Sequence, residues 1–228
     1  MKWILLVLVV LTSSLSLAAA PPEEKPVKAT GEVELQDAAG DMGPITTSSG
    51  EEPPLDVVLL AIKSDGKRLT FAATLNELPG RFATSSVTAY IDTDNNPATG
   101  ARIGMRGPGG FEYKAELSMC INFSDETRAC CGGSINAKPK ERYGAMNLEQ
   151  LKGESSYDDK ETVVDSMGFP GSKASVQVPV TGKVVESSVE YVDFMAKSGQ
   201  TIRVLAQESG GSATDGDGYF PTILLTLK

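Results

Sequence analysis

The stretch DVVLLAIKSDGKRLTFAATL, residues 56–75, decides the fold class. Residues 56–62 form an apolar run of the kind that fills the core of a sandwich, whereas residues 68–75 alternate between polar and apolar side chains. Between them, Asp65 and Gly66 supply the backbone freedom that a tight turn requires. The stretch therefore predicts a β-hairpin.

The rest of the chain repeats the pattern of strand, turn and strand. Further strands are expected at 86–91, 111–123, 162–165, 174–180, 188–194, 201–207 and 220–227. No segment keeps a helical period over ten residues, although residues 145–152 are long enough for one or two helical turns. We expect long surface loops at 104–110 and 141–159, which are polar or rich in glycine. Together these features predict an all-β fold, a two-sheet antiparallel β-sandwich of the jelly-roll kind.

The N-terminus has the layout of a secretory signal peptide. Lys2 provides a basic start, residues 3–11 are apolar, and small residues follow, which favours cleavage after Ala18. The apolar run is too short to span a bilayer with ease. We therefore expect a secreted or periplasmic protein. The expected organisation is a signal peptide at 1–18, a flexible lead-in rich in proline and charge at 19–30, and a single domain at 31–228.

Charge and composition exclude several functions. The chain has 21 basic and 30 acidic residues, so without Lys2 the exported chain carries 20 − 30 = −10 charges. Such a protein repels nucleic acid and anionic membranes, which leaves a polysaccharide or another exported protein as the expected partner. The chain also has no histidine. Catalysis and zinc binding that depend on an imidazole are therefore excluded.

Three cysteines are present: Cys120, Cys130 and Cys131. In an oxidising compartment we expect Cys120 to form a disulfide with one of the adjacent pair, and the sequence does not decide which. Closing a loop of this length stabilises the fold by roughly 3 kcal/mol in the chain-entropy estimate. A catalytic thiol is disfavoured because no histidine is available to activate it.

An acidic stretch follows one of the expected strands. YIDTDNNPATG, residues 90–100, places Asp92, Asp94 and Asn96 at alternate positions, as in the first half of a calcium-binding loop. An EF-hand is excluded, because Pro97 stands at the turn glycine and Ile103 at the closing glutamate. A looser calcium site is predicted instead. Its expected ligands are Asp92, Asp94, Asn96 and, if the next strand returns beside the first, Glu112.

The same stretch has a simpler interpretation as a turn. Aspartate and asparagine often end strands, where their side chains accept backbone N–H groups two residues further on. The acidic glycine-rich residues 215–218 are best explained by turn chemistry of this kind. A glycosidase would need two carboxyl groups facing each other across a cleft. No spacing in the sequence marks such a pair, and we expect no enzyme.

The order of the motifs resembles a known family. Along the chain come QDAAGD (36–41), LDV (55–57), the Asp-Gly hairpin, YIDTDNNPATG, GFEY (110–113), Asp217 and YFP (219–221). This succession resembles the family 9 carbohydrate-binding module-like, or DOMON-like, β-sandwich domains of secreted proteins, over residues 32–227. The resemblance implies a two-sheet jelly roll that binds saccharides, haem or other partners, often with structural calcium.

The composition narrows what this resemblance implies for the ligand. Saccharide-binding members stack sugar rings on aromatic side chains, and the only tryptophan, Trp3, is in the signal peptide. A platform would have to use tyrosines such as Tyr143, Tyr157, Tyr191 or Tyr219. Haem is disfavoured, because its histidine ligand is missing. We expect a non-catalytic binding module for carbohydrate, with a structural calcium ion. The alternative is a protein-interaction or envelope-structural domain that binds no sugar.

Overall fold

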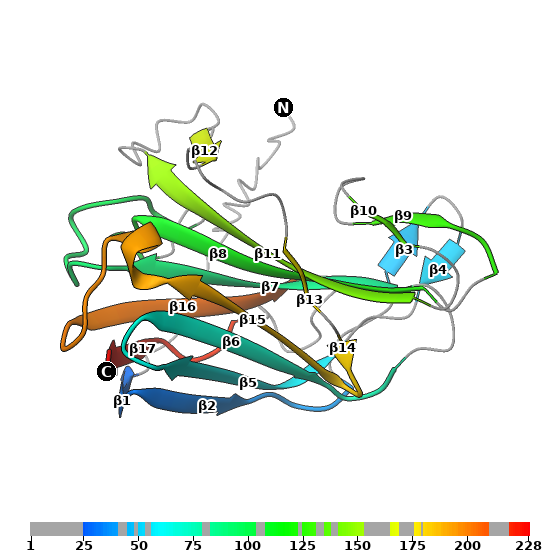
Figure 1. Cartoon of the computed structure of the whole chain (residues 1–228). Coiled ribbons are helices and arrows are strands. Elements are labelled where there is room, and N and C mark those ends of the chain that lie inside the picture. Colours follow the sequence, from blue (N-terminus) through cyan, green and yellow to red (C-terminus); the bar gives the residue numbers. More distant parts are fainter. Residues whose placement is uncertain are drawn as a thin grey trace, which may run out of the picture.

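The chain folds into two packed β-sheets, as the sequence predicts (Figure 1). A computed structural model describes residues 25–40, 45–47, 50–52, 56–78, 83–103, 108–122, 125–130, 135–137, 141–152, 165–168, 176–178, 180–209 and 219–228. The expected signal peptide and Tyr157 lie outside these residues. Within them, the regular structure is all strand apart from one 3-10 turn, and no helix is long and apolar enough to cross a membrane.

The larger sheet has eight strands and the smaller has five. The larger runs in the order β1 (Val27–Thr30), β17 (Ile223–Thr226), β16 (Thr201–Ser209), β7 (Ala83–Asp92), β8 (Tyr113–Asn122), β11 (Glu141–Lys152) and β12 (Asp165–Gly168), with β13 (Val176–Val178) also paired to β11. The smaller runs in the order β14 (Val180–Thr181), β15 (Val184–Glu190), β6 (Arg68–Leu75), β5 (Val57–Ser64) and β2 (Glu32–Gln36). Two short hairpins pair β3 (Ile45–Thr47) with β4 (Gly50–Glu52), and β9 (Arg128–Cys130) with β10 (Ile135–Ala137).

The predicted hairpin is confirmed as β5 and β6. The two strands pair in antiparallel register, with Ile62 opposite Phe71 and Ser64 opposite Leu69. In the turn, Asp65 Oδ1 accepts the backbone N–H groups of Lys67 and Arg68 at 2.9 and 2.8 Å. These hydrogen bonds close the turn and fix the register of both strands.

The core lies between the sheets and follows the alternation along the strands. The side chains that point inward are apolar and almost completely buried. Its largest members include Leu60, Ile62, Phe71 and Leu75 from the smaller sheet, and Ile91, Tyr113, Leu117 and Met119 from the larger. Truncating one of the buried leucines to alanine is expected to destabilise the fold by about 2–5 kcal/mol.

The region expected to form a loop with a short helix is a long strand. β11 covers residues 141–152 and pairs with β8 from Glu141 opposite Asn122 to Gln150 opposite Tyr113. Met146 and Leu148 are buried, whereas Asn147 and Glu149 point to the other face. The prediction of helical turns at 145–152 was therefore wrong. A complete partner strand outweighs the weak local preference of these residues for helix.

The strand expected at 188–194 ends early. β15 stops at Glu190, opposite Arg68, because β6 offers no partner beyond that residue. Tyr191–Phe194 form a 3-10 turn, η2, instead. Its first and last side chains are buried and meet edge to face with ring centroids 5.8 Å apart. Spacing of three residues, rather than alternation, carries both aromatic rings into the core.

The predicted lead-in ends sooner than expected. Within residues 19–30, Val27–Thr30 form β1, which pairs in parallel with β17, from Val27 opposite Ile223 to Thr30 opposite Thr226. This pair makes the larger sheet mixed, whereas every other strand pair described is antiparallel. The short run gains hydrogen bonds on the open edge of β17, and it is therefore ordered despite its flexible composition.

Candidate functional site

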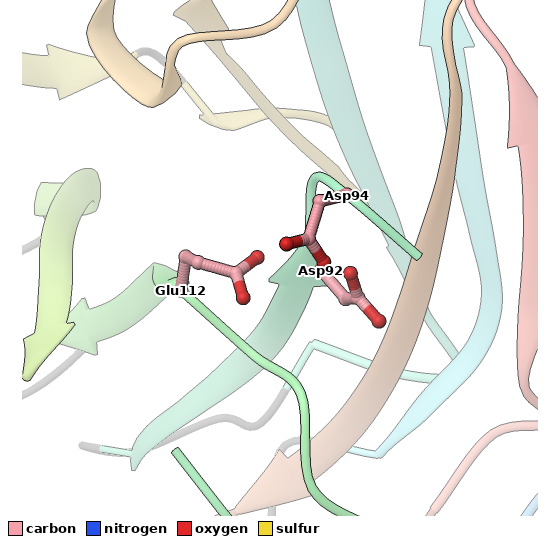
Figure 2. A group of neighbouring side chains, drawn as sticks. All are labelled: Asp92, Asp94 and Glu112. Carbon is pink, nitrogen blue, oxygen red and sulfur yellow. The ribbon is translucent and has the colours of Figure 1, made fainter. Parts of the chain in front are cut away.

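The predicted calcium ligands meet at one end of the larger sheet. Asp92 is the last residue of β7, and Glu112 precedes the first residue of β8, its neighbour in the sheet. One carboxylate oxygen from each of Asp92, Asp94 and Glu112 can be chosen so that the three lie within 4.8 Å of one another. Figure 2 shows the carboxyl groups of Asp94 and Glu112 pointing toward each other. We call these three residues the acidic cluster.

Asp92 is fully buried and is neutralised from within the chain. Its neighbour across the strand pair is Arg203, whose Nε donates to Asp92 Oδ2 at 2.9 Å and whose Nη2 lies 2.7 Å from the same oxygen in an ion pair. The guanidinium also lies over the ring of Phe111, 4.7 Å from its centroid, and donates to Gly109 O. Burial raises the pKa of Asp92, and the hydrogen bond and charge of Arg203 oppose that rise. The pair therefore ties the loop that follows β7 to the sheet.

Asn96 forms hydrogen bonds within the turn through both its side chain and its backbone. Its side-chain Oδ1 accepts the N–H of Ala98 at 3.1 Å, and its own N–H donates to Asp94 Oδ1 at 2.9 Å. These are the turn hydrogen bonds of the simpler interpretation, and that part of it is confirmed. The side-chain oxygen of Asn96 is thus committed to the turn. Its carbonyl oxygen faces the hydroxyl group of Thr99 instead.

Thr99, which the sequence did not single out, lies among several oxygens of the loop. Its Oγ1 is 2.9 Å from Asn96 O, 3.0 and 3.1 Å from the two carboxylate oxygens of Asp94, and 3.1 Å from Glu112 Oε1. A hydroxyl group has one hydrogen to donate and can satisfy one of these acceptors well. The other oxygens then face Oγ1 at about 3 Å with no hydrogen between them, which is unfavourable without a positive charge.

Glu112 completes the acidic cluster from the β8 side. Its Oε2 accepts the N–H of Thr93 at 2.8 Å. Burial raises the pKa of Glu112; the hydrogen bond from Thr93 lowers it, and the charges of Asp92 and Asp94 raise it further. Three carboxylates against one guanidinium leave 1 − 3 = −2 charges when all are ionised.

The end of the loop requires a glycine. Gly100 has φ +64, and a Cβ atom there would lie 2.5 Å from Phe111 O and 2.7 Å from Glu112 Oε1. The loop packs this closely because Phe111 and Ala101 form a small second core with Leu205 on the outward face of the larger sheet. Apolar packing in this second core therefore fixes the position of the loop that carries the acidic cluster.

A polar network lies beside this second core. On the outward face, Lys114 Nζ is 2.8 Å from Glu116 Oε2 and 3.9 Å from Glu149 Oε2, and Asn147 Nδ2 donates to Glu149 Oε1 at 2.9 Å. The three charged side chains are only 20–29% exposed. The register places Tyr90 opposite Lys114, and Lys114 opposite Glu149. We call these five residues the polar face.

The structure describes the side chains of two of the four tyrosines named for a sugar-binding platform, Tyr191 and Tyr219. Tyr191 was a wrong choice, because it is buried in the core with its hydroxyl group bonded to Ser64 Oγ. Tyr219 is 41% exposed, next to the larger sheet through a bridge to Gln207. Tyr143 is in β11, and its side chain is not described. Tyr90 was missed, although its alternation with Ala89 and Ile91 would have placed it on the outward face.

Cys120 is buried and disulfide-bonded. It lies in β8, on the same outward-facing set of positions as Lys114 and Glu116. Whether Cys130 or Cys131 is its partner stays a prediction.

Comparisons with known proteins leave the family open. No protein-family model matches the sequence, and no curated protein and no solved structure matches it. The resemblance to family 9 carbohydrate-binding module-like or DOMON-like domains therefore stays a prediction from the order of motifs.

Proposed function

We propose that this chain is an exported, non-catalytic binding module that takes a polyhydroxylated ligand, such as a saccharide, on the polar face. The observation that carries this proposal is the half-buried array of Lys114, Glu116, Glu149 and Asn147 on the outward side of two neighbouring strands, β8 and β11.

Sugar hydroxyl groups both donate and accept hydrogen bonds, so they suit a surface on which donors and acceptors alternate. Lys114 offers only donors, Glu116 and Glu149 offer only acceptors, and the amide of Asn147 offers both. Tyr90 adds an aromatic ring at the edge of this array, beside Phe111 at a centroid distance of 6.0 Å. The array is already held together by its own contacts, which reduces the entropy lost when a ligand binds.

The geometry of the acidic cluster supports a non-catalytic role. A retaining glycosidase needs two carboxyl groups about 5–5.5 Å apart on either side of a bond, with access to substrate. Asp92 has no exposed surface, and Arg203 holds one of its oxygens. Asp94 and Glu112 both contact the hydroxyl group of Thr99, so their carboxyl groups lie on the same side of it rather than on two sides of a bound substrate bond.

Binding to an array of glycans or a set of insoluble polysaccharides tests this proposal. Lys114→Met and Asn147→Ala should each weaken retention at least tenfold. Lys63→Met is the matched control, since Lys63 is paired with Glu32 at 2.8 Å on the other sheet. Absence of retention across a broad panel, or equal losses for Lys63→Met and Lys114→Met, would reject the polar face as a saccharide site.

We further propose that a calcium ion binds at the acidic cluster. Calcium takes six to eight oxygen ligands from carboxylates, carbonyls and waters. Asp94, Glu112 and the carbonyl of Asn96 supply such oxygens within 3.1 Å of the hydroxyl group of Thr99, which supplies another. Asp92 would contribute through Oδ1, since Oδ2 is held by Arg203. A divalent cation would balance the −2 charge of these residues.

Thermal unfolding of chelator-treated protein tests the calcium site. A ligand that binds only the folded state stabilises it by about 2.7 kcal/mol at 100 times its Kd, so added calcium should raise Tm. Asp94→Ala should lose most of that rise. Asp65→Ala is the matched control, because Asp65 closes a turn through the same type of backbone hydrogen bonds and is not part of the candidate metal-binding group found among the described residues. If Asp94→Ala retains the full rise, the loop is only a turn.

A protein-interaction role is the second candidate, and one observation favours it. Val192 and Met195 are 75% and 76% exposed on and just after η2, and Met195 has φ 55, which few side chains adopt. Changing both to serine should then abolish capture of a defined partner from the exported fraction. Val184→Ser should leave capture intact, because this valine, which is 37% exposed, lies at the start of β15, whereas η2 follows the end of that strand.

A further inference from the structure

The polar face carries a net negative charge. It holds one ammonium group, from Lys114, and two carboxylates, from Glu116 and Glu149, so its charge is 1 − 2 = −1 when all three are ionised. These side chains are only 20–29% exposed, and charges that are partly buried are screened less by salt than charges in open solvent. A ligand on this face therefore meets a negative charge that is only partly solvated.

The two carboxylates share Lys114 unequally. Lys114 Nζ lies 2.8 Å from Glu116 Oε2, the distance of a charged hydrogen bond, and 3.9 Å from Glu149 Oε2, which is too far for one. The other oxygen of Glu116 accepts the hydroxyl group of Ser118 at 3.2 Å. Oε1 of Glu149 accepts Asn147 Nδ2 at 2.9 Å, whereas its Oε2 receives no hydrogen bond from the described residues. Glu149 Oε2 can therefore accept a donor from a ligand.

The electrostatics of the polar face favour a positive charge. Burial lowers the pKa of Lys114, but its hydrogen bond with Glu116 and the charges of Glu116 and Glu149 outweigh this effect and raise that pKa. Tyr90 adds an aromatic ring, opposite Lys114 in the sheet, and aromatic rings attract cations. The whole chain acts in the same direction, because its 30 acidic residues outnumber 21 basic ones and repel anionic ligands.

We propose that the polar face selects saccharides that carry protonated amino groups, such as oligomers of a hexosamine with free amines, over neutral and acidic saccharides. A ligand ammonium group would donate to Glu149 Oε2, and the sugar hydroxyl groups would bond to Asn147 and Lys114. Glu149 is thus the residue that determines specificity. This inference rests on the proposed saccharide site and names the class of ligand that the site takes.

Isothermal titration calorimetry with oligosaccharides of equal length tests the proposal on the full exported chain. A glucosamine oligomer should bind with a Kd at least tenfold lower than its N-acetylated form, which has no charge, or a neutral glucose oligomer. Glu149→Gln keeps an oxygen for Asn147 and should lose this preference, while its Kd for the neutral oligomer stays unchanged. Glu190→Gln is the matched control and should keep the preference, because it removes a charge from the other sheet, where Glu190 pairs with Arg68 at 3.4 Å.

The outcomes separate this inference from the proposed function. Equal Kd values of wild type for the glucosamine oligomer and its N-acetylated form overturn the selection of amines and leave the saccharide site standing, and this comparison needs no variant. Binding of none of the saccharides overturns both. Equal losses of preference in Glu149→Gln and Glu190→Gln would assign the effect to the charge of the whole chain and overturn the role of the polar face. An oligolysine that binds as tightly as the glucosamine oligomer, and is weakened equally by Glu149→Gln, would identify a basic peptide as the ligand instead.

Discussion

The two ends of the sandwich bury carboxylates in different ways. At the β7–β8 end, Asp92 has a hydrogen bond and an ion pair with the guanidinium of Arg203, from the neighbouring strand, and an aromatic ring lies behind that guanidinium. At the other end, Asp56 has one backbone N–H and a second carboxylate from the facing sheet. The first arrangement carries its own counter-charge. The second leaves Asp56 Oδ1 buried without a hydrogen bond, so removing the charge of the buried aspartate should have opposite effects at the two ends.

The largest effect is expected from removing the counter-charge at the β7–β8 end. Arg203→Met leaves Asp92 buried and unpaired, and breaking a buried pair in this way costs about 3–5 kcal/mol. The free energy of unfolding in urea, measured in chelator, checks this value. The matched variant Lys63→Met, at an exposed pair, should cost under about 1 kcal/mol. Equal effects of the two variants would show that Arg203 is not needed to offset the charge of Asp92.

Two glycines with nearly the same backbone conformation give the next largest effect. Gly100 has φ +64 and Gly182 has φ +61, but a Cβ atom would meet Phe111 O at 2.5 Å in the first and nothing within 4 Å in the second. Gly182→Ala should cost about 1–2 kcal/mol for the left-handed conformation alone. Gly100→Ala should cost more, about 3 kcal/mol, because the backbone of Phe111 must also move.

The calcium-induced rise in Tm should also differ between these two glycine variants. Gly100→Ala should reduce the calcium-induced rise in Tm, because the added methyl group also approaches Glu112 Oε1 at 2.7 Å. Gly182→Ala should leave that rise unchanged. If both variants cost the same and both keep the rise, the loop at the β7–β8 end is less tightly packed than these distances indicate.

A smaller effect, of opposite sign, is expected at Asp56. In chelator, Asp56→Asn removes a buried charge near Glu208 while its side-chain oxygen still accepts the N–H of Gly40, so it should stabilise the fold by about 1 kcal/mol. In calcium the effect of this variant should be the same, because Asp56 lies at the opposite end of the sandwich from the acidic cluster. Asp92→Asn is the comparison and should destabilise in both conditions. Destabilisation by Asp56→Asn in chelator would contradict the unpaired state of Asp56.

Local patterns predicted much of the fold. The hairpin of β5 and β6 follows from an apolar run, an Asp-Gly turn and alternation, all within twenty residues. Alternation also places Met146 and Leu148 on one face of β11. This segment was nevertheless expected to be loop and helix, because its partner β8 is distant in sequence, and pairing across strands decides its conformation.

The candidate sites were harder to predict than the fold, because they depend even more on pairing between strands that are distant in sequence. The spacing of Asp92, Asp94 and Asn96 marked a loop rich in oxygen ligands, and Glu112 was predicted from the expected return of the chain. Arg203 was not predicted, because only the register of β16 with β7 brings it beside Asp92. Asp56 appeared in the sequence as the first residue of an apolar strand, and the lack of a hydrogen-bond donor to its Oδ1 is visible only once both sheets are packed.

The smallest effect on stability is expected at the polar face, whose charged side chains are only partly buried. Burial alone lowers the pKa of Lys114, but its hydrogen bond with Glu116 and the charges of Glu116 and Glu149 outweigh this, and the pKa is raised above 10.5. A cation with a raised pKa in the folded state adds stability that is fully present below pH 10.5 and is lost as pH rises through the folded-state pKa. The Tm difference between wild type and Lys114→Met should therefore be constant below about pH 10 and shrink over the range above pH 10.5. A difference that stays constant over this range would mean that Lys114 acts through packing of its aliphatic chain, and that counter-charge matters only where burial is complete, as at Asp92.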